Sequence, residues 1–60
     1  MFIAVSTRKI NPVKWETVGE GETWAEAEAH AFRLIGNERA MTRAVMMNNL
    51  HIVSVKDARK

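Results

Sequence analysis

The residues that could perform nucleophilic chemistry are few: two serines, two histidines and one aspartate. A serine nucleophile needs a histidine base beside it and an acid that orients the histidine. The possible members of such a triad are Ser6, Ser54, His30, His51 and Asp57, or a glutamate in place of the aspartate. No G-x-S-x-G sequence surrounds either serine, and both serines fall inside alternating strand patterns. We therefore predict no catalytic residue and no enzymatic activity.

Two further patterns suggest ligand sites at first sight. Glu26 and His30 are four residues apart, so on a helix they could share a metal ion, with His51 or a glutamate as a further ligand. An exposed pair of this spacing is usually a solvated surface contact, and we expect His51 to be a half-buried residue at a sheet edge. The segment Gly19-Glu20-Gly21 precedes a helix as phosphate-binding loops do, but it lacks the lysine and its glutamate would repel an anion. We therefore predict no metal and no cofactor.

The clearest structural pattern is a helix over residues 23–36. Thr23 and Glu26 have the T-x-x-E spacing of a capping box, and Gly36 is placed to end the helix in a left-handed conformation. At about 100° per residue, one apolar face is formed by Trp24, Ala27, Ala31, Leu34 and Ile35. Glu28 interrupts the apolar arc. It either marks the border of the core or stands at the rim of a second apolar strip, formed by Ala25, Ala29 and Phe32, that a partner would cover.

The remaining segments predict a sheet for this helix to cover. Residues 2–9 and 13–18 alternate as strands around Asn11-Pro12, and residues 50–56 alternate as a third strand. Residues 37–49 favour a second helix with Asn37 as N-cap and Asn48 or Asn49 as a left-handed end, although residues 42–47 could instead form a strand. The predicted fold class is α+β: a small antiparallel sheet, β-β-α-[α or β]-β in order, with one amphipathic helix across one face.

The composition indicates one small domain, residues 1–60, with residues 57–60 as a frayed basic tail. The chain has 60 residues, a net charge of +2 and no cysteine. A core this thin, without disulfides, favours association with a second copy, so we expect a homodimer. No apolar run is long enough to span a bilayer and no signal peptide is recognisable, so we expect a cytoplasmic protein without a membrane partner.

The charges are unevenly distributed along the chain. Five carboxylates and no basic residue lie between Glu16 and Glu28. Such an acidic edge, together with flexible methionines, is typical of a surface that docks on another protein. The predicted partner-binding residues are Glu16, Glu20, Glu22, Glu28, Phe32, Met41, Met46 and Met47, although the methionines could instead fill the core.

The function that we expect is non-enzymatic binding. In size and character the chain resembles the small phage, plasmid and toxin-system products that block a larger protein, which predicts an inhibitor or antitoxin acting in a bacterial host. The alternative is a small nucleic-acid-binding protein that uses a basic sheet face and the tail, with an aromatic side chain stacking on a base. Its residues would be Arg8, Lys9, Lys14, Trp15, Lys56, Arg59 and Lys60. On base rates, however, we expect both Trp15 and Trp24 to be core residues.

Overall fold

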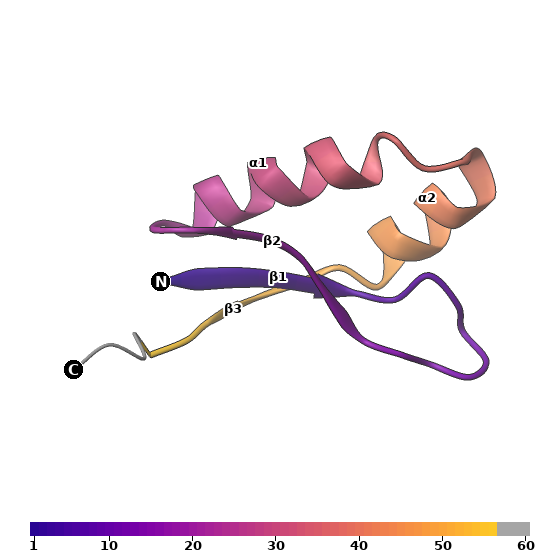
Figure 1. Ribbon diagram of the computed structural model, residues 1–60, viewed down its shortest axis with the longest axis horizontal. Coiled ribbons are helices and arrows are strands. Elements are labelled where there is room, and N and C mark those ends of the chain that lie inside the picture. The colour runs from indigo at the N-terminus through magenta and orange to yellow at the C-terminus, as the bar shows by residue number, and fades with distance from the viewer. Residues whose placement is uncertain (57–60) are drawn as a thin grey trace.

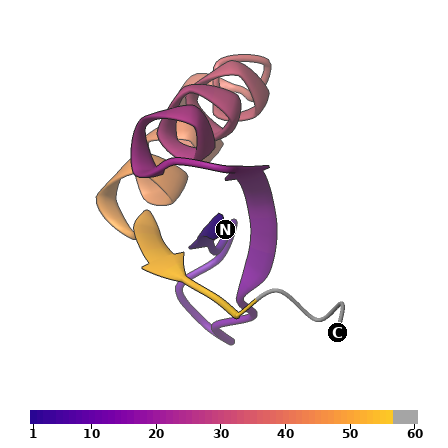
Figure 2. The ribbon, with the colours of Figure 1, turned by 90° about the vertical axis from the view of Figure 1, so that its left-hand side faces the viewer.

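The computed structural model describes residues 1–56, so the predicted tail at 57–60 lies outside the described residues. The elements follow in the order β1 (Phe2–Ser6), β2 (Glu16–Gly21), α1 (Trp24–Ile35), α2 (Ala40–Asn48) and β3 (His51–Ser54). The strands form one antiparallel sheet in the order β2-β1-β3, and both helices lie on the same side of it (Figures 1 and 2). The predicted α+β class is confirmed. Residues 40–48 are helical, so the strand alternative for this segment is wrong.

The second strand differs from its prediction. It begins at Glu16 and includes Gly19 and Gly21, which lie beyond the strand predicted at residues 13–18. The register passes from Ala4 opposite Gly19 to Val5 opposite Thr17, so Val18 is an extra residue in a β-bulge. The bulge lets Val18 and Gly19 both be buried in succession. The glycines belong to the strand because α1 packs directly on it, not because the chain turns there.

The first strand ends earlier than predicted because Thr7 organises a loop over residues 7–15. Its buried hydroxyl donates to the carbonyl oxygen of Lys9 at 2.6 Å and accepts from the amide of Lys14 at 3.3 Å. The Asn11-Pro12 peptide bond in this loop is cis. The predicted turn at Asn11-Pro12 is therefore the tip of a wide loop rather than of a tight hairpin.

The core lies between the sheet and the two helices. Its buried members are Ala4, Val18, Ala31, Ile35 and Met46, and the half-buried side chains of Leu34, Leu50 and Ile52 pack against them. Trp15 and Trp24 do not belong to it: their exposed fractions are 51% and 49%. The prediction that they are core residues is wrong. The sheet and α1 approach each other through glycine and alanine, and such a narrow gap has no room for an indole ring.

Side chains contribute hydrogen bonds at the start of α1 and at the end of α2. The predicted capping box of α1 is confirmed: the Thr23 hydroxyl accepts from the Glu26 amide, and the Glu26 carboxylate accepts from the Thr23 amide. Gly36 has a φ of −61°, so the predicted left-handed stop is wrong. The N-cap of α2 is Arg39, not Asn37. Asn49 has a φ of −112° and its side-chain amide donates to the Val45 carbonyl at 2.8 Å, so this asparagine ends α2 without a left-handed conformation.

Candidate functional site

One face of the sheet carries both helices, and the other carries neither (Figure 2). We call the second the open face. The register places Ile3 opposite Val53 and Glu20, and it places Val5 opposite His51 and Thr17. Paired residues of an antiparallel sheet point to the same side, and Ala4 points to the helices as part of the core. The open face is therefore formed by Ile3, Val5, Thr17, Glu20, His51 and Val53.

The centre of the open face is apolar. Ile3 and Val5 of the central strand are half-buried, and Val53 of β3 has an exposed fraction of 41%. β-Branched side chains on a sheet normally face a second layer that removes them from water. Within residues 1–56 that layer is missing on this side. An uncovered apolar sheet face of this kind is a feature of binding surfaces.

An aromatic contact closes one end of the open face. Trp15 precedes β2 and His51 begins β3, and their ring centroids are 5.5 Å apart at an interplanar angle of 59°. Both side chains are exposed. We expected His51 at a sheet edge but half-buried; it is on the edge strand and exposed. The contact brings together the first residue of one edge strand, β3, and the residue that precedes the other edge strand, β2, so it joins both edges of the open face.

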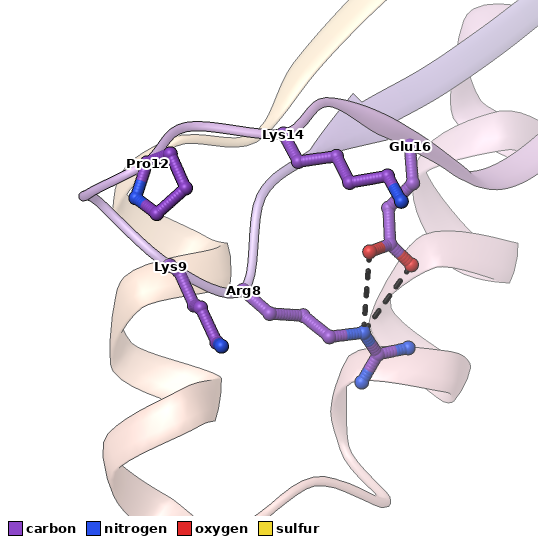
Figure 3. Close-up of a pocket in the computed structure, with 5 residues that line it drawn as sticks. All are labelled: Arg8, Lys9, Pro12, Lys14 and Glu16. Carbon is purple, nitrogen blue, oxygen red and sulfur yellow. Dashed lines mark hydrogen bonds and ion pairs between the residues drawn. The ribbon is translucent and has the colours of Figure 1, made fainter.

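A hollow of about 230 Å³ lies in the 7–15 loop and the start of β2. Figure 3 shows the side chains that line it: Arg8, Lys9, Pro12, Lys14 and Glu16. The hollow thus gathers three of the residues that the nucleic-acid alternative named, and Trp15 is adjacent to them in the chain. Lys9 and Lys14 form no ion pair among the described residues.

Arg8 is already occupied by intramolecular ion pairs. Its Nε lies 3.2 Å from Glu16 Oε1, and its guanidinium also donates to Glu38 in the segment between the two helices. The hydrogen bond to Glu38 is the largest cause of a raised pKa of Arg8, and Glu16 contributes in the same direction. Arg8 therefore ties the 7–15 loop to β2 and to the helix connection. Of the basic residues in the hollow, only the lysines remain for an external ligand.

The predicted acidic edge is not one continuous surface. Glu16 lies at the loop end of the sheet and is paired with Arg8, while Glu26 accepts the backbone bonds of the capping box. Glu20 and Glu22 lie at the other end of β2, and their side chains form no ion pair within residues 1–56. Glu28 is half-buried on α1. The structure thus leaves Glu20 and Glu22 as the free part of the acidic edge.

The predicted methionine surface also has fewer exposed members than expected. Met46 is fully buried in the core, so the alternative that we left open, in which methionines fill the core, holds for this residue. Met41, Met47 and Phe32 are exposed on the helices. They belong to the side of the molecule opposite the open face. Within residues 1–56, therefore, the predicted partner-binding residues fall on separate surfaces.

The basic set of the alternative is also divided. Val55 donates its amide to the Met1 carbonyl at 2.9 Å, so Lys56 lies near the start of β1, at the opposite end of the sheet from the 7–15 loop. Arg59 and Lys60 fall outside the described residues. Of the described residues in this basic set, only Arg8, Lys9 and Lys14 lie together, around the hollow.

Ser6 and His30, which were considered for catalysis and metal binding, have structural partners, and Asp57 lies outside the described residues. The Ser6 hydroxyl donates to the Met46 carbonyl at 2.6 Å in the interior, and the Glu20 amide donates to His30 Nδ1 at 3.1 Å. Ser6 and His51 lie on opposite faces of the sheet. In the part of the chain that the structure describes, no three His, Asp or Glu side chains gather as metal ligands. No helix in that part is long and apolar enough to cross a membrane.

Comparison with known proteins adds no relative: no protein-family model, no curated protein and no solved structure matches the chain. The candidate site therefore depends on geometry alone. Sequence reasoning missed Ile3, Val5 and Val53 as site residues. The signal that could have found them is that both sets of alternating residues in the first strand are largely apolar, whereas only one face of the sheet has a helix to cover it.

Proposed function

We propose that this chain is a non-catalytic binding module that holds a protein partner on the open face of its sheet. The observation that carries the proposal is the uncovered apolar centre of Ile3, Val5 and Val53, with the exposed Trp15 at its end. A protein interface typically has an apolar core, with tryptophan among the residues that contribute most to affinity, and a polar rim. Here Thr17 and Glu20 supply polar positions on the same face.

The charges of this face favour a protein over a nucleic acid. None of the strand residues on the open face is Lys or Arg, and Glu20 would repel a phosphate backbone. The loop lysines and Glu20 lie at opposite ends of β2, so the face has a basic end and an acidic end. A complementary partner has an apolar patch flanked by charges in the reverse order. An inhibitor that blocks a larger protein by occupying its surface needs only such a complementary docking face and no catalytic residue.

The experiment is capture from a nuclease-treated lysate of the cells that make the protein. The immobilised parent chain is compared with Thr17→Lys, which adds a long charged side chain to the open face at an already exposed position. We expect the parent to retain a specific protein and the variant to lose it. If the parent retains nothing, or if both chains retain the same protein equally, the open face is not the docking surface.

A second candidate function is binding of single-stranded nucleic acid, which one observation favours. Trp15 is exposed against His51, and it follows Lys14 in the chain, which lines the hollow together with Lys9. An aromatic ring can stack on a base while nearby lysines contact phosphate. Arg8 adds no free positive charge to this site, because it is paired with two glutamates.

Fluorescence separates the two candidates. The chain has two tryptophans, so Trp24→Phe leaves Trp15 as the sole reporter. Nucleic-acid binding predicts that a single-stranded oligonucleotide quenches Trp15, that affinity falls linearly with the logarithm of salt concentration, and that Lys9→Gln with Lys14→Gln abolishes the quenching. Docking of a protein predicts no quenching by the oligonucleotide at moderate salt.

A further inference from the structure

The outer edge of β3 has unpaired backbone groups whose direction can be assigned. The amide of Val55 donates to the Met1 carbonyl at 2.9 Å, which continues the register of Ile3 opposite Val53. Hydrogen-bonded and non-hydrogen-bonded pairs alternate along antiparallel strands, so Val53 and His51 also direct their backbone groups to β1. The N–H and C=O groups of Ile52 and Ser54 then point away from the sheet. Among residues 1–56 no other strand pairs with this edge.

The two edges of the sheet are protected very differently. β2, at one edge, carries Glu16 and Glu20 and a β-bulge, which are features that discourage the addition of another strand. β3, at the other edge, consists of His51, Ile52, Val53 and Ser54 and contains no proline, no lysine and no carboxylate. Its Val53 side chain is exposed. The β3 edge is therefore open to strand pairing.

We propose that β3 pairs with β3 of a second copy of this chain in an antiparallel, two-fold symmetric arrangement centred on Val53. In this register Ile52 of each copy exchanges backbone hydrogen bonds with Ser54 of the other, and the two Val53 side chains meet across the axis. Outside these pairs, Val55 lies opposite His51 and Lys56 lies opposite Leu50. No two like charges face each other, so the uncharged strand is complementary to itself.

The pairing extends the proposed binding surface, and in this respect it rests on the proposed function. A two-fold axis perpendicular to the sheet keeps the helices of both copies on one side. The two open faces then join into one apolar surface, with the Val53 pair at its centre. An edge formed by four residues buries little area, so the dimer is expected to be weak. Its formation needs no partner protein, and it can be measured on the purified chain alone.

Sedimentation equilibrium over a concentration series up to about 1 mM tests the pairing, since weak interfaces require high concentration. We expect the parent to dimerise and Val53→Lys to be monomeric, because two lysines would meet at the axis. Thr17→Lys is the matched control: it adds the same charge to the same face on the other edge strand and should still dimerise. A mixture of Val53→Lys and Val53→Glu should form a heterodimer, since opposite charges then meet. Circular dichroism verifies that each variant is folded.

A backbone test removes the edge hydrogen bond without changing any side chain. A chain of this length is accessible to chemical synthesis, and N-methylation of the Ser54 amide blocks an outward donor while leaving the bonds to β1 intact. We expect this chain to fold and remain monomeric, whereas Ser54→Ala, which keeps the amide, dimerises like the parent. The proposal is overturned if the parent is a monomer at about 1 mM, if Val53→Lys or the N-methylated chain still dimerises, or if Thr17→Lys abolishes association.

Discussion

Gly19 of β2 packs directly against the backbone of Ala31 in α1. A Cβ atom placed on Gly19 would lie 2.7 Å from the amide nitrogen of Ala31 and 2.9 Å from the carbonyl oxygen of Ala27. Gly21 approaches the first turn of α1 in the same way, with the Ala27 nitrogen at 2.7 Å from its added Cβ. The helix therefore crosses the sheet at backbone contact distance, and this approach determines which side chains fit in the core.

The first prediction follows from that contact. Gly19→Ala places a methyl group against backbone atoms that cannot rotate away, so the free energy of unfolding should fall by about 3 kcal/mol or more. Gly36→Ala is the matched control. Its added Cβ lies 3.1 Å from the nearest atom and its φ of −61° suits any residue, so stability should change by no more than about 1 kcal/mol. Urea unfolding measures both. Equal effects of the two substitutions would show that the close approach at Gly19 is not a constraint.

A second prediction concerns the buried hydrogen bond between Ser6 and the Met46 carbonyl, which joins β1 to the last turn of α2. Ser6→Ala removes the donor and leaves a carbonyl oxygen in the interior, at a cost of about 1–3 kcal/mol. Ser54→Ala, on the exposed edge strand, should change stability by less than about 0.5 kcal/mol. Both changes in the free energy of unfolding are measured as shifts of the urea midpoint, with the slope of the free energy against urea concentration unchanged. A Ser6→Ala variant as stable as the parent would mean that α2 is held by Met46 packing alone.

A third prediction concerns the start of α1. Thr23→Ala removes one half of the capping box and should destabilise the protein by about 1 kcal/mol, which corresponds to several degrees in melting temperature for a domain of this size. Glu26→Gln is the control, because glutamine can accept the same backbone hydrogen bonds. Thermal denaturation followed by circular dichroism measures the change. If Thr23→Ala and the parent have the same melting temperature, the capping box does not stabilise the protein.

The parts of the fold that sequence predicts are those set by local spacing. Thr23 and Glu26 are three residues apart, and their capping box depends on nothing outside the helix. Ala27, Ala31 and Ile35 follow the helical period and are buried as expected. Gly19 and Gly21 were misassigned because their role depends on a helix that approaches from elsewhere in the chain. Trp24 was misassigned for the same reason, since the gap is too narrow for it.

The candidate site was predicted only in fragments. Trp15 and the loop lysines were named for their chemistry, and the structure places the lysines around one hollow, with Trp15 following Lys14 in the chain. Ile3, Val5 and Val53 were read as ordinary strand residues. Whether a second layer covers them depends on the face of the sheet against which α2 packs. The sequence of α2 does not indicate this face. Met46 determines the side in the structure, because it is buried in the same core as α1.

A fourth prediction concerns the acidic end of the molecule. Glu20→Lys combined with Glu22→Lys should weaken partner binding and leave the melting temperature nearly unchanged. The carboxylates of these residues form no hydrogen bond or ion pair among residues 1–56, and their contacts with His30 and Glu26 are made by backbone groups, which the substitutions keep. Isothermal titration with the captured protein measures the affinity. Unaltered affinity would assign these glutamates to the solvated surface and limit the interface to the apolar centre and Trp15.

The most direct test of the open face compares the two exposed tryptophans. Trp15 lies at the end of the open face and Trp24 begins α1, and their exposed fractions are nearly equal at 51% and 49%. Replacing either with alanine therefore removes a similar amount of exposed apolar surface. Titration of the protein captured by the parent chain should show a loss of affinity on the order of 30-fold for Trp15→Ala, which corresponds to about 2 kcal/mol, and no loss for Trp24→Ala. An equal loss for both variants, or a loss for Trp24→Ala alone, would contradict the assignment of the open face as the binding surface.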